Sequence, residues 1–587
     1  MVPIDPDLPF ECSATLEDRW DAIRKVILSS DVPDLDPRKP KAVTFSTIRS
    51  ILPLHSYFSG GAGRQRQLIS QSIFDIQLAS FLVVPNTAVD EGTYEFDEIW
   101  EHFGGVDERK EKTGLPLDAS DEMRSLDEAI DNLRLCLALR STLSLKLKEQ
   151  NLEDSFYQLE SPIAFLLASI ECSGIGFLPT RLTNMETRLD EKIGSIAAIV
   201  QGFSSDPDFN IRSPRQIAKL LFTDLNIPKP ASNPYTSQKK KTDQISTGVE
   251  VLLSVKGAHE VVPLLLEYRK LNKVKTTYIS SLTSFCVGGA GDMTKIYPVW
   301  HTLRTRTGRL SCSKPNMQNI PNKAIFEGVH PRDAFVAGKS ETLFSVDYRQ
   351  IEIRILAHFT QDHALMKLFR DSENDIYKSM SMRITGKKSI SDVTGNERAI
   401  AKQVVLAVVY GMGAPQVAKK LGVEISAAAT FFNNFFAGFP GVRRWMQSVK
   451  RFAVNNGYIL TITGRRRWLP DIRSENREKS ARAGRQAVNS VIQGSSADLV
   501  KLAMIKVASN LEMWNNSGEK APELLLQIHD ELVFSLPETR VHVERLKKLV
   551  ERCLCLEVVR DLRIQVALLV TCKVGKSFGD AMVDYIE

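Results

Sequence analysis

The sequence predicts a multidomain α/β protein. With 587 residues, the chain is too long for one ordinary hydrophobic core, so several domains are expected. Its second half contains both kinds of regular element. Residues 344–354 read as a strand followed by a helix, residues 524–534 as a β-hairpin, and residues 398–411 as a long helix. The fold should therefore combine a sheet with long helices.

The composition is that of a soluble globular protein with a modest positive charge. Hydrophobic residues make up 43% and charged residues 25% of the chain, and the net charge is +6. This charge permits a polyanionic partner without requiring one. The eight cysteines are scattered and contain no CxxC pair, so they indicate neither a zinc site nor a disulfide framework, and a reducing compartment is expected.

No segment reads as a membrane anchor or a targeting peptide. No apolar run is long enough to span a bilayer. Residues 1–9 lack the features of a secretory signal peptide and of an Arg-rich transit peptide. No membrane association is therefore expected.

Two Ser-Pro pairs mark expected helix starts in the first half of the chain. Ser161-Pro162 and Ser213-Pro214 each combine an N-cap residue with a proline suited to the first turn. A polar stretch, residues 228–247, contains Lys239, Lys240 and Lys241 and reads as a solvated connection. A long helix with several cations follows at residues 261–278. These cations either form a solvated helix face or follow a phosphate backbone.

Residues 344–354 are expected to present a carboxylate at the end of a strand. The apolar run leads to Asp347, after which Ile351, Ile355 and Phe359 have helical spacing. A carboxylate at a strand terminus is held rigidly enough to coordinate a metal ion. By itself, however, an Asp-Tyr pair is a weak signal.

A second carboxylate lies in the expected hairpin. His529, Asp530 and Glu531 fall at its turn, between two apolar runs. Acidic residues in a turn more often serve solubility than catalysis. Two carboxylates brought together could nevertheless bind two Mg²⁺ ions for in-line phosphoryl transfer, so the combination with Asp347 carries the interpretation.

The helix at residues 398–411 carries a cationic stripe. Arg398, Lys402, Leu406 and Tyr410 recur every four residues and so share one face. The two cations are suited to phosphate binding, and Leu406 and Tyr410 could pack on a sugar and a base. The simpler alternative is an amphipathic helix with two surface charges. Gly411 is expected to end the helix.

Together these segments resemble DNA polymerase family A, the class of bacterial DNA polymerase I. The similarity extends in order from about Ser161 to the C-terminus, and any one of its motifs would be weak alone. The motifs are Thr307-Gly-Arg-Leu-Ser311, Pro315-Asn-Met-Gln-Asn-Ile-Pro321, the Asp347 segment, the helix 398–411, Gly464-Arg-Arg-Arg467, Arg485 to Gly494 and Gln527-Ile-His-Asp-Glu531. The resemblance implies a right-hand polymerase with palm, fingers and thumb, preceded by an exonuclease-like α/β domain.

The resemblance implies a two-metal active site. Asp347 and Asp530 would bind two Mg²⁺ ions, with Mn²⁺ as an alternative, the carbonyl of Tyr348 would be a further ligand, and Glu531 would be a nearby catalytic residue. One metal would activate the primer 3′-hydroxyl, and the other would hold the triphosphate and neutralise the leaving pyrophosphate.

The resemblance also implies a deoxynucleotide site. Arg398 and Lys402 would contact the incoming phosphates, and Lys402 would protonate the leaving group. Tyr410 would stack at the templating position, and Glu352 would exclude a ribose 2′-hydroxyl. The implied nucleotide-binding set is Arg398, Lys402, Leu406, Tyr410, Gln350, Glu352 and Tyr377.

Primer–template DNA is the implied macromolecular partner. Contacts along the minor groove test base-pair shape without reading sequence, because the groove's acceptors are shared by all base pairs. The implied DNA-binding set is Arg309, Asn316, Gln318, Asn319, Arg485, Asn489, Gln493, His529, Lys239, Lys240 and Lys241. A monomer is expected, with repair proteins as candidate partners.

Three positions depart from the bacterial pattern. Arg349 replaces a small Ser after Asp-Tyr, Tyr377 replaces a triphosphate-binding His, and Leu406 replaces the Phe or Tyr that packs on the incoming sugar. Tyr377, together with the segment Val405-Leu-Ala-Val-Val-Tyr-Gly411, resembles the eukaryotic repair branch, polymerases nu and theta. That resemblance implies repair or translesion synthesis, and a nuclear location.

The N-terminal region resembles the 3′–5′ exonuclease domain of the family only in outline. No Asp-x-Glu, which the two-metal exonuclease requires, occurs before residue 155, so this domain is expected to lack proofreading. The expected boundaries are 1–155 for the degenerate exonuclease-like domain, 156–295 for the thumb with the start of the palm, 296–375 for the first part of the palm, 376–500 for the fingers and 501–587 for the second part of the palm.

The expected activity is that of a DNA-directed DNA polymerase (EC 2.7.7.7). One alternative is an inactive family member that acts as a DNA scaffold, and the intact Asp347, Asp530, Arg398 and Lys402 argue against it. Another is a single-subunit RNA polymerase, against which Glu352 and the segment from Arg485 to Gln493 argue.

Overall fold

The computed structural model describes residues 42–44, 73–83, 99, 103, 135–136, 138–228, 246–287, 293–302, 304–326, 328–370, 375–515, 519–579 and 583–584. The predicted contacts of Lys239, Lys240 and Lys241 lie outside the described residues, as does most of the predicted exonuclease-like domain.

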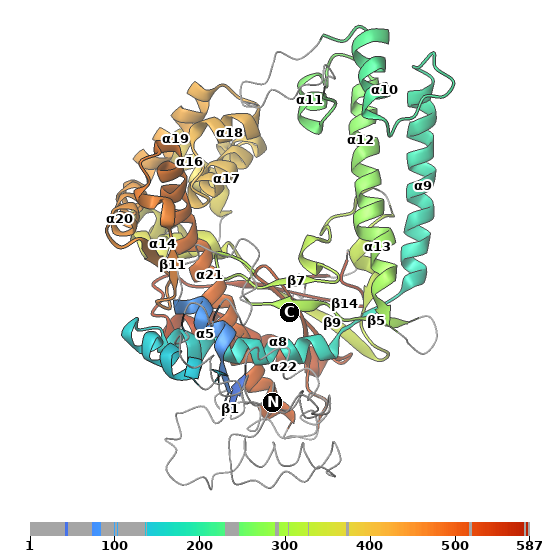
Figure 1. Cartoon of the computed structure of the whole chain (residues 1–587). Helices are drawn as coiled ribbons and strands as arrows, with labels where there is room; N and C mark the ends of the chain where they lie inside the picture. The colour runs from blue at the N-terminus through green and yellow to red at the C-terminus, as the bar shows by residue number, and fades with distance from the viewer. Residues whose placement is uncertain are drawn as a thin grey trace, which may run out of the picture.

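A five-stranded antiparallel sheet forms the base of the molecule (Figure 1). Its strand order is β12-β13-β9-β14-β15, with β12 Glu523–Ile528, β13 Glu531–Pro537, β9 Glu341–Tyr348, β14 Val570–Gly575 and β15 Val583–Asp584. The central strand β9 is buried along most of its length, because it pairs with β13 on one side and with β14 on the other. The expected hairpin is confirmed as β12 and β13, which are joined by a two-residue turn at residues 529–530.

Smaller sheets surround this base. A four-stranded sheet has the order β4-β5-β3-β8, and β6 pairs with β7, β10 with β11 and β1 with β2. Their bounds are β4 Cys286–Val287, β5 Thr294–Ile296, β3 Ile175–Phe177, β8 Phe335–Val336, β6 Val299–His301, β7 Ser311–Ser313, β10 Tyr458–Leu460, β11 Arg466–Trp468, β1 Ala42–Thr44 and β2 Ile73–Asp75.

A helical arm, made of residues 179–228 and 246–285, rises on one side of the sheet (Figure 1). Its long helices α9 and α12 are amphipathic and bury one apolar stripe each, which includes Leu189 and Leu265. The predicted helix at 261–278 is confirmed and continues to Phe285. The arm's elements are α9 Pro179–Gln201, α10 Pro214–Lys219, η3 Leu220–Asp224, α11 Val249–Ser254, α12 Val261–Val274, η4 Lys275–Ile279, α13 Ser280–Leu282 and η5 Thr283–Phe285.

Both predicted α-helices are confirmed, but only one of the two predicted N-caps is. Ser213 caps α10, and its side chain accepts a hydrogen bond from the backbone of Gln216. Ser161 is the first residue of α8 (Ser161–Ser173) but not its N-cap, because the π-helical turn η2 (Ser155–Glu160) runs directly into this helix. The preceding Glu160 already has helical dihedral angles, so no N-terminal group is left for Ser161 to cap.

A helical lobe, residues 351–456, rises on the opposite side of the sheet (Figure 1). It contains α14 Ile351–Thr360, α15 His363–Arg370, α16 Ile376–Thr385, η8 Ile390–Asp392, α17 Gly395–Val409, α18 Ala414–Leu421, α19 Ile425–Gly438 and α20 Pro440–Asn456. The predicted helix at 398–411 is confirmed as α17. A capping box between Thr394 and Glu397 starts it, and Gly411 follows its end with φ +65°.

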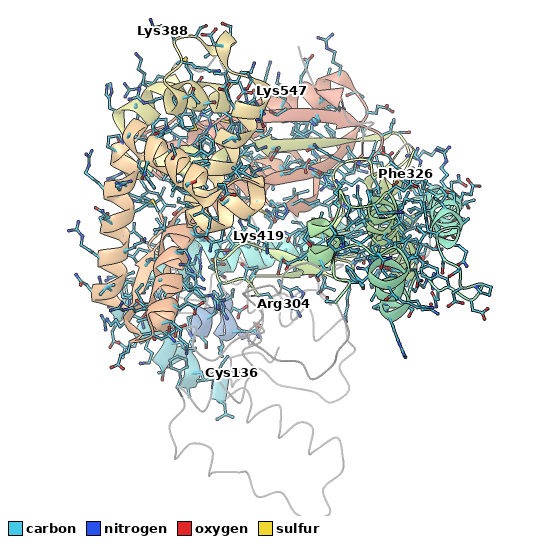
Figure 2. The ribbon with its side chains drawn as sticks, turned by 90° about the horizontal axis from the view of Figure 1, so that it is seen from above. Cys136, Arg304, Phe326, Lys388, Lys419 and Lys547 are labelled. Atoms are coloured by element: carbon cyan, nitrogen blue, oxygen red, sulfur yellow. The ribbon has the colours of Figure 1, made fainter. Side chains whose placement is uncertain are left out.

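The lobe returns to the sheet through the 39-residue helix α21, Arg477–Asn515. The lobe and the arm also touch at their far ends. Lys419 on α18 donates a hydrogen bond to Glu250 on α11 at 2.9 Å, and Figure 2 shows Lys419 beside the green segments of the arm. The remaining elements are α5 Ile76–Val83, η6 Met317–Asn319, η7 Pro331–Ala334, η9 Pro470–Arg473, α22 Arg540–Glu551, η10 Arg552–Glu557 and α23 Val558–Asp561.

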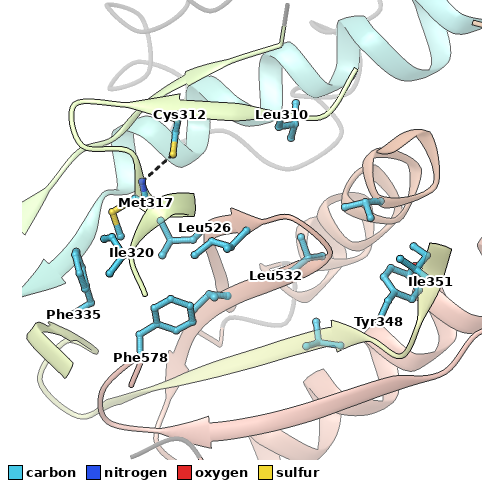
Figure 3. Close-up of a cluster of buried hydrophobic side chains, with 14 of the residues drawn as sticks. Leu310, Cys312, Met317, Ile320, Phe335, Tyr348, Ile351, Leu526, Leu532 and Phe578 are labelled. Carbon is cyan, nitrogen blue, oxygen red and sulfur yellow. Dashed lines mark hydrogen bonds between the residues drawn. The ribbon is translucent and has the colours of Figure 1, made fainter. Parts of the chain in front are cut away.

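One apolar core extends through the sheet, the arm and the lobe. Figure 3 shows the part of it around the hairpin, where Leu526 lies beside Met317 and Ile320, and Tyr348 lies beside Ile351. A second core joins Phe74, α5 and Phe156. In the described part of the chain, no helix combines the length and apolarity needed to cross a membrane.

Candidate active site

Three acidic residues from distant parts of the chain meet at one edge of the central sheet. Asp347 is the next-to-last residue of β9, Asp530 lies in the β12–β13 turn, and Glu531 begins β13. Glu531 faces Asp347 directly in the strand register. The backbone N–H of Tyr348 lies 3.4 Å from the carbonyl of Asp530. The structure therefore brings together all four residues of the predicted metal site.

The pKa values of both aspartates are raised above the ordinary range. The pKa of Asp347 is raised to about 7, first by desolvation and then by the charges of Asp530 and Glu531, while Lys573 lowers it. Neighbouring protein atoms desolvate the Asp347 carboxylate, even though part of the residue remains exposed to water. The pKa of Asp530 is raised to about 6, mainly by burial, although its backbone hydrogen bond and Arg309 lower it.

This donor set fits a hard divalent cation. Carboxylate and carbonyl oxygens are the ligands that Mg²⁺ prefers, and Mg²⁺ usually combines one or two carboxylates with substrate phosphates. The Tyr348 ring is buried and its hydroxyl donates to Leu554 at 3.0 Å, so only its carbonyl is suited to be a ligand. Among the described residues, no group of three or more His, Cys, Asp or Glu side chains has the arrangement of a complete metal site. Part of the coordination would thus fall to the substrate.

Glu531 is held by neighbours of its own. The Ser345 hydroxyl donates to one carboxylate oxygen, and Arg332 lies 3.5 Å from the other. Arg332 is buried, lies 4.5 Å from the centre of the Phe578 ring and donates to the carbonyl of Ile320 at 3.3 Å. Sequence reasoning missed Arg332, because an isolated arginine outside any recognisable motif gives no signal.

The β12–β13 turn is fixed by a small polar network. His529 has φ +60°, which the first position of both primed hairpin turns requires and which is strained for a residue with a side chain. The Gln527 side chain donates to the His529 carbonyl. Gln318, in turn, donates to the carbonyls of Leu310 at 3.0 Å and Gln527 at 3.5 Å. Gln318 thus contacts the metal-site hairpin.

Asn316 and Asn319, the other two predicted DNA contacts in the Pro315 to Pro321 motif, lie beside Gln318. Asn316 caps η6 by accepting a hydrogen bond from the Gln318 backbone at 3.1 Å. Asn319 is exposed at the end of the same turn. Asn316 therefore shapes the backbone that presents Gln318.

The cationic stripe of α17 packs on Tyr377. The Arg398 guanidinium and the Lys402 ammonium lie 5.7 and 5.5 Å from the centre of its ring. Tyr377 is buried, and burial, followed by the charge of Glu352, raises its pKa to about 12. Tyr377 is therefore a neutral support beneath the two cations.

Arg398 already has a carboxylate partner, which sequence reasoning also missed. Its Nε donates to Asp375 at 2.7 Å. Asp375 also caps α16 by accepting from the backbones of Tyr377 and Lys378 at 2.9 and 3.1 Å. Burial opposes ionisation of Asp375, but the Arg398 hydrogen bond and these backbone bonds lower its pKa.

Glu352 connects the sheet edge to the lobe. It lies in the first turn of α14, next to Gln350, whose φ of +50° places it in the left-handed region. The Arg309 guanidinium forms an ion pair with the Glu352 carboxylate. The pKa of Tyr410 is raised by burial and then by Glu352, while a hydrogen bond with Gln493 lowers it. These four side chains converge beside the metal site.

Residues on α21 complete the site. Arg485, Asn489 and Gln493 recur every four residues on this helix, and each is partly exposed. Arg485 and Asn489 line a pocket of roughly 490 Å³ beside Tyr410. Further cations of this pocket are Arg306 and Arg482, which sequence reasoning did not single out, and Arg467, which belongs to the Gly464-Arg-Arg-Arg467 motif but had no role assigned to it.

Leu406 and Arg349 are the two remaining positions that depart from the bacterial pattern. Leu406 is partly buried on the stripe of α17. Arg349, which replaces a small Ser after Asp-Tyr, has its backbone fixed by a hydrogen bond to Leu569 at 2.8 Å. Burial, followed by the charge of Arg349, lowers the pKa of Arg354 to about 10.

The central sheet, the two helical parts and the acidic residues at one sheet edge define a mixed helix-and-sheet fold with a candidate metal site. The family model for DNA polymerase family A matches residues 179–580, and the chain belongs to that family. Its fold is accordingly the mixed helix and sheet arrangement of palm, fingers and thumb.

Individual relatives agree with the family. DNA polymerase I of Lactococcus lactis subsp. cremoris (strain MG1363) is 33% identical over 510 residues, which is 86% of this chain and 55% of that protein. DNA polymerase I of Bacillus caldotenax is 34% identical over 513 residues, with 87% and 55% covered. This chain thus spans about half the length of these relatives.

A solved structure is similar to the whole arrangement. The POL domain of Pol1 from M. smegmatis, in complex with DNA primer–template and dNTP, superposes with a TM-score of 0.72 at 28% identity. The match covers 86% of this chain and 82% of that domain.

Proposed function

We propose that this protein is a template-directed DNA polymerase that adds deoxynucleotides to a primer 3′-hydroxyl. The observation that carries the proposal is the meeting of Asp347 and Asp530, from the end of β9 and the β12–β13 turn, at one edge of the central sheet. The neighbouring cations Arg398 and Lys402, on one face of α17, supply a site for the triphosphate. The Pol1 domain of similar structure was solved with primer–template and dNTP, which supports the same ligands here.

Asp347, Asp530 and the Tyr348 carbonyl would hold the metal ions, two Mg²⁺ with Mn²⁺ as an alternative. When bound, these ions supply Lewis-acid activation of the primer hydroxyl and charge neutralisation at the phosphates. Glu531, fixed by Ser345 and Arg332, adds negative charge at the same edge and favours cation binding there.

Arg398 and Lys402 bind the incoming phosphates, and Tyr377 supports both cations. Because Arg398 is paired with Asp375, the triphosphate replaces a carboxylate when it binds. Lys402 is exposed and donates a proton to the leaving pyrophosphate.

The remaining nucleotide-site residues select the sugar and the base. Glu352 occupies the space of a ribose 2′-hydroxyl, next to Gln350. Leu406 packs on the sugar and Tyr410 stacks at the templating position. Glu352 is fixed by its ion pair with Arg309, so the sugar gate and a minor-groove contact are coupled.

The proposed DNA-binding residues come from several segments around the candidate metal site. Gln318 and His529 act beside the hairpin, and Arg309 acts beside Glu352. The full proposed set is Arg309, Asn316, Gln318, Asn319, Arg485, Asn489, Gln493, His529, Lys239, Lys240 and Lys241.

The proposed domains keep the sequence boundaries: a degenerate exonuclease-like domain at 1–155, the thumb with the start of the palm at 156–295, the palm at 296–375 and 501–587, and the fingers at 376–500. The boundary at residue 500 lies within α21, so this helix belongs to both fingers and palm. The helical arm corresponds to the thumb and the helical lobe to the fingers.

The biological role proposed is DNA repair or translesion synthesis in the nucleus, as for polymerases nu and theta, by a monomer that lacks proofreading and works with repair proteins. Support comes from Tyr377 beneath the stripe and from Leu406 in place of an aromatic residue. The absence of an Asp-x-Glu before residue 155 supports the lack of proofreading. Metal-dependent degradation of a single-stranded 3′ end, abolished by changes within residues 1–155, would contradict it.

Primer extension tests the proposed activity. Wild type should extend a primer with dNTPs and Mg²⁺, whereas Asp530→Asn should bind the same DNA and fail to extend it. Tight DNA binding without extension by wild type would instead indicate an inactive scaffold. Extension with NTPs as fast as with dNTPs would indicate an RNA polymerase and remove the gate role of Glu352.

A further inference from the structure

Four charged side chains lie buried together behind the proposed DNA contacts. Glu160, Arg465, Asp498 and Lys501 are each no more than 2% exposed. Glu160 ends η2, Arg465 lies between β10 and β11, and the other two are on α21. Burying charges is unfavourable unless they are paired and hydrogen-bonded, so the arrangement requires an account beyond stability.

Arg465 is the centre of this cluster. Its guanidinium donates to Asp498 at 2.7 and 3.0 Å, to the carbonyl of Thr307 at 2.8 Å and to the carbonyl of Gly494 at 3.3 Å. Thr463 holds the second oxygen of Asp498 at 2.7 Å. A single planar group thus connects the turn at Thr307 to helix α21.

Both connected segments carry proposed DNA contacts. Thr307 lies two residues before Arg309, and Gly494 directly follows Gln493. Arg309 pairs with Glu352, and Gln493 hydrogen-bonds to Tyr410. The two carbonyls that Arg465 binds therefore set the spacing between these two groups of proposed DNA contacts.

Two glycines make room for the guanidinium. A Cβ on Gly308, which has φ +80°, would lie 2.4 Å from the Arg465 guanidinium. A Cβ on Gly494 would lie 2.6 Å from Thr461 and 3.3 Å from Arg465. The guanidinium is therefore packed directly against the backbone at these two glycines, so its position determines the positions of both backbone segments.

We propose that Arg465 is a positioning residue for mismatch sensing, because it holds the Arg309 turn and the Gln493 region of α21 at the spacing of a correctly paired primer terminus. The inference rests on the proposed polymerase function and deepens it. Lysine cannot replace the arginine, because an ammonium lacks the planar fork that reaches several acceptors at once.

The test compares extension of matched and mismatched primer termini by wild type and Arg465→Lys. Because small misplacements of binding groups can cost about 100-fold, the variant should lose roughly 10- to 100-fold in kcat on a matched terminus. Extension of a mismatched terminus, which already lacks the correct fit, should change much less. The matched-to-mismatched ratio should therefore fall about tenfold or more, with the KM for dNTP nearly unchanged because Arg398 and Lys402 are outside the cluster.

A matched control separates positioning from stability. The double variant Glu160→Gln with Lys501→Met removes the Lys501–Glu160 ion pair and the longer 3.7 Å pairing of Glu160 with Arg465, but leaves every Arg465 hydrogen bond in place. Its matched-to-mismatched ratio should stay at the wild-type value, even where its Tm falls as far as that of Arg465→Lys. An unchanged ratio in Arg465→Lys, or an equal change in the control, would overturn the proposal.

A second variant covers the case in which Arg465→Lys does not fold. Gly494→Ala pushes against Thr461 and Arg465, so it should reduce the ratio, and adding Thr461→Ser should partly restore it; an unchanged ratio in Gly494→Ala would equally overturn the proposal. Failure of wild type to extend a matched primer in the same assay would refute the polymerase function itself, whereas an active wild type with insensitive variants would refute only the role of Arg465.

Discussion

Releasing Arg398 from Asp375 is expected to tighten binding of the incoming nucleotide. The proposed triphosphate has to replace the Asp375 carboxylate, which lies 2.7 Å from the Arg398 Nε. Asp375→Asn removes the competing charge. It also keeps the helix cap that Asp375 provides to α16, because Asn and Asp cap helices about equally well.

The size of the effect follows from the exposure of the pair. The Arg398 and Asp375 side chains are 38% and 34% exposed, so solvent screens their attraction and the pair contributes only about 0.5–1 kcal/mol. The Kd for dNTP should therefore fall about two- to fivefold. The gain should shrink at high salt, because screening weakens the pair that wild type has to break.

Measurement of dNTP Kd by single-turnover primer extension tests this reasoning. Glu397→Gln is the matched control, since it removes a paired carboxylate one residue from Arg398 and retains a residue suited to the capping box. The control should leave the Kd nearly unchanged. Weaker dNTP binding by Asp375→Asn, or an equal gain in the control, would refute the competition.

Three further outcomes are expected. Burial raises the pKa of Glu171 to about 7, so the folded state holds a proton that the unfolded chain releases near its ordinary value of 4.5. Wild type should therefore lose about 3 kcal/mol of stability as pH rises from about 4.5 to 7. Glu171→Gln, which can still accept from the Trp300 backbone, should lack this pH-dependent loss in denaturant titrations, and parallel pH profiles would contradict the assignment. Gly411→Ala should destabilise the protein by about 1–3 kcal/mol, because φ is +65° and the new Cβ would lie 2.7 Å from the Arg485 carbonyl; an unchanged Tm would show that the contact is relieved elsewhere. Glu352→Ala should raise NTP incorporation relative to dNTP by roughly 10- to 100-fold, measured as a ratio of kcat/KM values, and an unchanged ratio would exclude the gate.

Local sequence was sufficient to predict a helix or a hairpin wherever the residues of that element specify it by themselves. The helix at Arg398 starts at a capping box and is followed by Gly411 with positive φ, and both signals are readable in the sequence. The hairpin around Asp530 is likewise set by two apolar runs that flank a short polar turn. The Ser-Pro pair at Ser161 correctly predicted an α-helix. Its predicted N-cap role was wrong, because the preceding residues are already helical.

The residues whose roles could not be predicted from the sequence share one property, which is a partner far away in the chain. Arg332, Asp375 and Arg465 act through partners that are remote in sequence, namely Glu531, Arg398 and Asp498. No spacing rule relates such pairs, because their geometry depends on how β9, α16 and α21 pack. In the sequence these three residues look like any other charged residue, and only the folded structure shows which partner each one contacts.

The sequence by itself determined the family, the elements that carry the chemistry and the identity of the two aspartates, because these depend on local periodicity, turn residues and ordered motifs. Only the tertiary structure decided that Asp375 pairs with Arg398, that Arg332 and Ser345 hold Glu531, and that Arg465 joins two segments that carry proposed DNA contacts. The physical reason is that charge pairing and burial act over a few ångströms in space, and the chain reaches those distances only after it has folded.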